Sequence, residues 1–125
     1  MINWNNLDTL TSFQELSEVE RVNLAEVMSG ENGAERVKDY SVPMTEDLTY
    51  NYAAKAVDDK VLAALAKLAK EAQLTEKYAA LYNGEVINTG EKRLVLHQLT
   101  RGQLGDKVEA DGVDKREFYV KQQQR

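Results

Sequence analysis

Residues 58–73, DDKVLAALAKLAKEAQ, contain the clearest helical pattern of the sequence. Aspartates occupy the first positions and lysines lie towards the end, as the dipole of an α-helix favours. The segment therefore predicts an amphipathic α-helix from about Asp58 to Gln73. Its apolar stripe is formed by side chains that recur every three or four residues: Val61, Leu62, Leu65, Leu68 and Ala69.

Downstream of residue 73 the pattern predicts further helices. Thr75 is a candidate N-cap for a helix that continues to Tyr82, and Gly84 is expected to end it in the left-handed conformation. Asn88 followed by Glu91 is typical of a capping box, and it predicts another helix start. Three apolar residues would lie on one face of that helix: Val95, Leu96 and Leu99. Glycines then indicate a loop: Gly102, Gly105 and Gly112. A final helix is predicted from Asp114 and Glu117, and we expect the chain end to interrupt it.

Upstream of residue 58, residues 40–44 and 48–52 are predicted as two short β-strands. Pro43 has no amide donor, which limits the first strand to a sheet edge. An alternative extends the following helix back to Tyr52, because alanines are strong helix formers. The strand interpretation is favoured by alternation that is typical of a half-buried strand: Leu48, Tyr50 and Tyr52.

The first 28 residues carry two further helical patterns, at about residues 7–16 and 19–28, with Asp8 and Ser17 as possible N-caps. Residues 29–33, SGENG, are predicted to form a turn. Several glutamates are interpreted as a solvated face: Glu15, Glu18 and Glu20. The predicted fold class is mainly α with a short β-hairpin (α+β).

The composition is that of an acidic globular protein, with a formal net charge of −5, 42% apolar residues and 30% charged residues. Acidic balance repels phosphate backbones, so nucleic acid is not an expected partner. The sequence has no cysteine, no signal-peptide pattern and no apolar run of about 20 residues, so we expect a cytoplasmic protein without a membrane partner. Glycine-rich nucleotide motifs are also absent.

No metal or other cofactor is expected. An EF-hand centred on Gly112 would place Lys107 and Phe118 at ligand positions, and neither supplies a carboxylate. The single histidine, His97, could act as an acid or base, but no partner is placed beside it, and a structural role is favoured. Arg93 and Arg101 are about two helical turns apart and could hold an anion, although pairing with carboxylates is more common. Four tyrosines could form a carbohydrate platform: Tyr50, Tyr52, Tyr78 and Tyr82. For Tyr78 and Tyr82, which are four residues apart, half-buried packing is favoured.

The stretch 81–97, LYNGEVINTGEKRLVLH, resembles a signature of glucose-6-phosphate isomerases, roughly M-F-x-G-x-x-I-N-x-T-E-x-R-x-V-L-H followed by a short helix ending in Arg. The matching positions are Gly84, Ile87, Asn88, Glu91, Arg93, Val95, Leu96, His97 and Arg101. Asp111–Asp114 is similar to the family's D-G-x-D. Departures occur at residues 51–54, NYAA in place of D-Y-S-K, and at Thr89, which is one position out of register.

This resemblance implies that residues 1–125 are the N-terminal helical cap region of a sugar-isomerase-type α/β enzyme. The whole enzyme would interconvert glucose 6-phosphate and fructose 6-phosphate, in glycolysis and gluconeogenesis, without a cofactor. The family's phosphate loops and catalytic glutamate are absent from residues 1–125, so no residue here is expected to be catalytic, substrate-binding or metal-binding, and the nine signature positions are expected to be structural. The missing part would bind the sugar phosphate.

The expected partners are therefore the remaining α/β domains and a second subunit, because the family usually forms homodimers. The fragment alone is predicted to be inactive. The alternative interpretation is a stand-alone acidic helical protein-interaction module.

Overall fold

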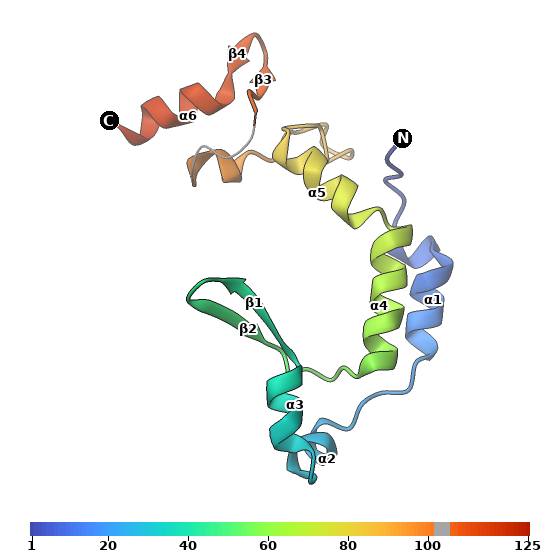
Figure 1. Ribbon diagram of the computed structural model, residues 1–125. Helices are drawn as coiled ribbons and strands as arrows, with labels where there is room; N and C mark the ends of the chain where they lie inside the picture. Colours follow the sequence, from blue (N-terminus) through green and yellow to red (C-terminus); the bar gives the residue numbers. More distant parts are fainter. Residues whose placement is uncertain (102–105) are drawn as a thin grey trace. The chain divides into compact units, whose positions relative to one another are not determined.

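The computed structural model describes residues 1–101 and 106–125, which group into two compact units (Figure 1). One unit comprises Asp8–Leu68, and the other comprises Met1–Leu7 with Ala69–Arg125. The described residues are mainly helical, with short antiparallel strand pairs. This confirms the predicted α+β class, whereas the assignment of residues 1–125 to one N-terminal region stays a prediction.

The unit Asp8–Leu68 begins with short helices that differ in detail from the predicted ones. A 3₁₀ turn η1 (Leu7–Thr9) precedes α1 (Thr11–Glu18), and α2 (Leu24–Ser29) follows an extended segment. The two predicted N-caps are wrong. Asp8 lies inside η1, and the Ser17 hydroxyl donates to the Gln14 carbonyl at 2.6 Å within α1. The side chain of Asn23 caps α2 instead, accepting a hydrogen bond from the Glu26 amide at 3.4 Å.

The sequence did not predict α3 (Gly33–Asp39), which leads into the hairpin of β1 (Ser41–Thr45) and β2 (Leu48–Asn51). The strands pair antiparallel with an irregularity between Pro43 and Thr45. The hairpin prediction is confirmed, and the alternative of a helix reaching back to Tyr52 is wrong. The expectation of half-buried residues holds only for Tyr52 and is wrong for Leu48 and Tyr50, which are 57% and 50% exposed.

One buried arginine holds the chain that follows the hairpin. The Arg36 Nε donates to the Ala53 carbonyl at 2.9 Å, and its Nη2 donates to the carbonyls of Lys55 at 3.0 Å and Val57 at 2.7 Å. The guanidinium also lies 4.2 Å from the ring centroid of Tyr40. Arg36 is 8% exposed, so a buried cation binds three backbone oxygens of this unit, of which the Lys55 carbonyl also accepts from the Val57 amide at 2.8 Å.

The predicted central helix is confirmed as α4 (Asp59–Glu71), capped by the Asp58 carboxylate, which accepts from the Val61 amide at 2.8 Å. The next helix is α5 (Leu74–Tyr82). Its predicted N-cap Thr75 is wrong, because the N-cap is Gln73, whose φ of 52° separates the two helices.

The helix predicted after Asn88 is absent. The Asn88 Oδ1 accepts from the Glu91 amide at 3.1 Å, as a cap would, but the Asn88 carbonyl then accepts from the Arg93 amide at 3.2 Å and closes a turn. The same side-chain bond serves helix starts and turns alike, and Gly90 favours the turn. Between Asn88 and Arg101, the only helical backbone is the 3₁₀ segment η2 (His97–Thr100).

The last elements are a hairpin of β3 (Glu109–Ala110) and β4 (Val113–Asp114), followed by α6 (Lys115–Gln123). The hairpin was predicted only as a loop. Its turn has φ of 53° at Asp111 and 71° at Gly112, which the Asp-Gly pair supports. The predicted final helix is confirmed, with Asp114 as its N-cap. The other two glycines of the predicted loop, Gly102 and Gly105, lie outside the described residues.

Candidate functional site

Gly84 fixes the geometry of the signature segment. It ends α5 with φ of 73°, which confirms the predicted left-handed conformation. A Cβ built on Gly84 would lie 2.3 Å from the Cγ1 of Val108, and Val108 is only 1% exposed. Glycine is therefore required twice at this position, once for its φ and once for close packing.

The turn after Gly84 carries three polar signature residues at the surface. Asn88 closes the turn through its side chain and carbonyl, as described above. Arg93 lies 3.6 Å from the Glu91 carboxylate, and both side chains are more than 60% exposed. Such an exposed pair contributes little to stability. Ile87 is half-buried on the same turn.

A cavity of about 320 Å³ lies beside the end of the signature segment. Its lining residues come from α5, from the segment before η2, and from η2 with its C-cap: Tyr78, Leu81, Tyr82, Val95, His97, Gln98 and Arg101. The Gln98 Nε2 donates to the Leu81 carbonyl at 2.9 Å and so ties η2 to α5. His97 and Arg101 are exposed, and Leu99 beneath them is 1% exposed.

This cavity brings together Val95, His97 and Arg101 and leaves the other signature residues outside its lining. Arg93 and Arg101 do not lie on one helix, because only His97–Thr100 is helical in this region. The lining offers an imidazole, a guanidinium and phenol hydroxyls but no carboxylate, so it lacks the glutamate base that a sugar-phosphate isomerase uses. Chemically, the cavity can accept an anion or a polar group.

The four tyrosines considered as a carbohydrate platform form two separate pairs. The rings of Tyr78 and Tyr82 lie 5.5 Å apart in one unit, and those of Tyr50 and Tyr52 lie 6.0 Å apart in the other. The packing interpretation of Tyr78 and Tyr82 fits Tyr82, which is half-buried, but not Tyr78, which is 61% exposed.

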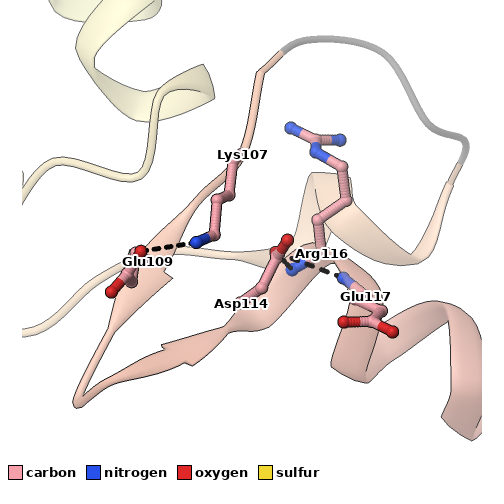
Figure 2. Close-up of polar contacts among 5 residues, drawn as sticks. All are labelled: Lys107, Glu109, Asp114, Arg116 and Glu117. Carbon is pink, nitrogen blue, oxygen red and sulfur yellow. Dashed lines mark hydrogen bonds and ion pairs between the residues drawn. The ribbon is translucent and has the colours of Figure 1, made fainter.

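Charged residues around the second hairpin mostly pair with each other (Figure 2). Lys107 lies 2.7 Å from the Glu109 carboxylate, and this hydrogen bond raises the pKa of Lys107. The Asp114 carboxylate accepts from the amides of Arg116 at 3.0 Å and Glu117 at 3.3 Å (Figure 2). These groups are occupied in capping and ion pairing, which indicates a structural role.

Arg116 is a partial exception. Its Nε donates to the Asp106 carbonyl at 2.9 Å. Its Nη1 and Nη2 are buried and have no hydrogen-bond partner among the described residues. Sequence reasoning missed Arg116 and also Arg36. No sequence pattern indicates the role of either arginine. The pair Asp111-Gly112 is typical of a hairpin turn, and it indicates only the hairpin that positions Arg116.

The unit Asp8–Leu68 has a cavity of about 500 Å³ between α2 and α3. Its charged lining is mostly acidic, which disfavours a phosphate ester: Glu26, Glu31, Glu35, Asp39 and Arg36. Tyr40 at its edge donates to the Asp59 carboxylate at 3.1 Å. Desolvation, and then this hydrogen bond, raises the pKa of Tyr40.

Residues 1–101 and 106–125 contain neither a metal-binding cluster nor a helix that could span a membrane. No group of three or more histidine or acidic side chains is arranged to hold a metal ion there. Among the helices of that same part of the chain, none has the length and apolar character needed to cross a membrane.

The chain is similar to known proteins over most of its length. The family model for phosphoglucose isomerase matches residues 51–124. A glucose-6-phosphate isomerase of Treponema denticola is 52% identical over 122 residues, covering 94% of this chain and 23% of that relative. The corresponding protein of Treponema pallidum is 42% identical over 128 residues, covering 99% of this chain and 24% of the relative.

A glucose-6-phosphate isomerase of Borreliella burgdorferi is 38% identical over 121 residues, covering 95% of this chain. The chain thus spans about a quarter of the length of the curated relatives that it matches. The matched residues include the whole signature segment and extend through the second hairpin into α6. The chain belongs to the phosphoglucose isomerase family.

Proposed function

We propose that this chain serves as the N-terminal helical part of a glucose-6-phosphate isomerase, the enzyme that interconverts glucose 6-phosphate and fructose 6-phosphate. The observation that carries the proposal is the 52% identity to the isomerase of Treponema denticola over 94% of this chain. Because the match extends over only 23% of that relative, most of the polypeptide that performs catalysis in it has no counterpart here.

In this proposal the chain supplies structure rather than chemistry. The described lining of the cavity beside His97 and Arg101 has no carboxylate, and we assign a structural role to the nine signature positions. Gly84 packs on Val108, Asn88 closes a turn, and η2 is tied to α5 through Gln98. The sugar phosphate would bind to the remaining α/β domains, in a cytoplasmic homodimer that serves glycolysis and gluconeogenesis.

The surface of the chain supports this role. With a mass of 14.1 kDa, it exposes 9892 Å². Two separate compact bodies of half this mass would together expose only about 8,100 Å². Large apolar side chains account for part of this surface, among them Met44, Leu48 and Leu74, each more than half exposed. Such a surface is typical of a segment that packs against further polypeptide.

The proposal is tested with a chimera in which this chain replaces the matching segment of the Treponema denticola isomerase. We expect the chimera to interconvert the two sugar phosphates at a rate within about tenfold of the parent, because a structural segment should not change the transition-state contacts. The 125-residue chain alone should show no turnover in the same coupled assay. A folded chimera without activity would contradict the proposal and favour the stand-alone interaction module.

A further inference from the structure

The hairpin of β1 and β2 has one apolar face and one polar face. Val42 is paired with Tyr50, so the two side chains lie on the same face. Leu48 and Tyr52 follow on that face, because they are each two residues from Tyr50 along the chain. The opposite face carries polar residues and a proline: Ser41, Pro43, Thr49 and Asn51. Val42 is 46% exposed and Leu48 is 57% exposed.

The apolar face of the hairpin continues into a groove of about 420 Å³. We call this surface the hairpin groove; it is lined by Val42, Tyr50, Tyr52, Lys55, Val57 and Leu62. Among the described residues, Lys55 is the only charged one in the lining of the groove. The floor of the groove is held in place, because Arg36 binds the carbonyls of Lys55 and Val57. The groove is therefore a formed surface and not a loose loop.

A two-stranded hairpin with an uncovered apolar face is marginally stable on its own. Figure 1 shows β1 and β2 extending away from the end of α3 as a separate arm of their unit. Within the unit Asp8–Leu68, the apolar residues of the hairpin stay largely exposed, so this face is open to a covering segment. Interfaces that are nearly free of charge at their centre are typical of permanent contacts, such as those within one protein.

We propose that the hairpin groove is a docking surface for the remaining polypeptide of the same isomerase. This inference rests on the proposed function, since the relatives contain about three times as much additional chain as the segment that matches here. The docking segment should present aliphatic side chains to Val42, Tyr50 and Leu62, with a carboxylate near Lys55. A second copy of this chain is a less suitable occupant, because its own groove carries lysine and would place two cations together.

The test measures side-chain exposure in two proteins, the 125-residue chain and the chimera with the Treponema denticola isomerase. Hydroxyl-radical oxidation is followed by mass spectrometry at Leu48 and Tyr50. Oxidation should be about tenfold slower in the chimera, because the centre of a permanent interface packs as densely as a protein interior. Equal oxidation rates in the two proteins would overturn the proposal.

Matched variants add a second readout. Tyr50→Glu places a charge in the hairpin groove, whereas Thr49→Glu places the same charge on the opposite face of the same strand. In the chimera, Tyr50→Glu should return Leu48 to the fast oxidation of the isolated chain, and Thr49→Glu should leave it slow. An equal effect of both variants would show that the groove is not the docking surface.

Activity separates this inference from the proposed function. An inactive chimera with a protected hairpin would reject the function and keep the docking surface. An active chimera with a fully oxidised hairpin would keep the proposed function and reject the docking surface. Sedimentation of the isolated chain tests the second-copy alternative, and a dimer that Tyr50→Glu dissociates, while Thr49→Glu does not, would overturn the assignment to the remaining polypeptide.

Discussion

Replacing Arg36 by methionine should destabilise the unit Asp8–Leu68 more than almost any other single change in it. The substitution keeps an unbranched apolar stem but removes hydrogen bonds to the carbonyls of Ala53, Lys55 and Val57. A hydrogen bond from a charged donor contributes about 1.5–3 kcal/mol, and a buried acceptor left unpaired loses about that much. The bond to Ala53 is buried, and the other two are partly buried.

The buried hydrogen bond should therefore contribute its full free energy to stability. The other two should contribute only part of theirs, because water can reach their carbonyls. The expected loss is about 3–4 kcal/mol in the free energy of unfolding. Arg36→Lys should recover only a fraction, because an ammonium group cannot reproduce the planar fork that contacts several carbonyls. The effect should not change between mildly acidic and mildly basic pH, since guanidinium stays charged.

The measurement is native-state amide exchange in the 125-residue chain, followed at the Tyr52 amide, which donates to the Tyr40 carbonyl at 2.9 Å. Protection at Tyr52 should fall by about two to three orders of magnitude in Arg36→Met, because every 1.4 kcal/mol corresponds to a factor of ten. The exposed Arg21 provides the control, and Arg21→Met should leave exchange unchanged. A loss below about 1 kcal/mol at Arg36 would refute the claim that its hydrogen bonds hold the chain after the hairpin.

Three other changes have defined outcomes. Gly84→Ala should destabilise the unit that contains α5 by about 2–4 kcal/mol in chemical denaturation, because the new methyl group meets Val108 and the backbone has a positive φ; an effect under 1 kcal/mol would contradict the packing described. Asp114→Ala should cost about 1 kcal/mol and fray the start of α6, seen as faster exchange of its first amides, and unchanged exchange would count against the cap. In the active chimera, His97→Gln should lower thermal stability modestly and keep kcat within a few-fold of the starting protein, whereas a loss of about a thousandfold with the fold intact would assign His97 a catalytic role.

The sequence predicted the elements whose signals are local and lead to one structure only. The stripe of residues 58–73 formed α4, the strands at 40–44 and 48–52 formed β1 and β2, and Asp114 capped α6. Gly84 was placed correctly because few residues other than glycine adopt its φ. Each of these signals depends on a periodicity or on a backbone conformation, both of which are properties of neighbouring residues.

The errors arose where one local signal serves two structures. Asn88 makes the side-chain bond of a helix cap, yet it closes a turn, because the carbonyl that could start a helix pairs with the Arg93 amide instead. Burial of Leu48 and Tyr50 was predicted from alternation, but alternation only says which side chains share a face. Whether that face is covered depends on residues far along the chain or outside it.

For the candidate site, too, the sequence predicted local features but not contacts between distant residues. The resemblance placed the nine signature positions in sequence, but it did not show that His97 and Arg101 line one cavity with Tyr78 while Arg93 lies elsewhere. Arg36 and Arg116 gave no sequence signal, because an arginine that binds distant carbonyls resembles any surface arginine until the partners are known.

The short reach of the Arg36 hydrogen bonds has a consequence for biosynthesis. Its three acceptors lie 17, 19 and 21 residues further along the chain, and loops of about ten residues close in about 10–100 ns. A ribosome adds only about 5–20 residues per second. Chain synthesis is therefore far slower than loop closure, and Arg36 can bind each acceptor long before later segments are made. The unit Asp8–Leu68 can therefore assemble during translation, before any residue beyond Leu68 is needed. The apolar face of its hairpin would then stay exposed on the nascent chain for seconds, while later residues are still being added.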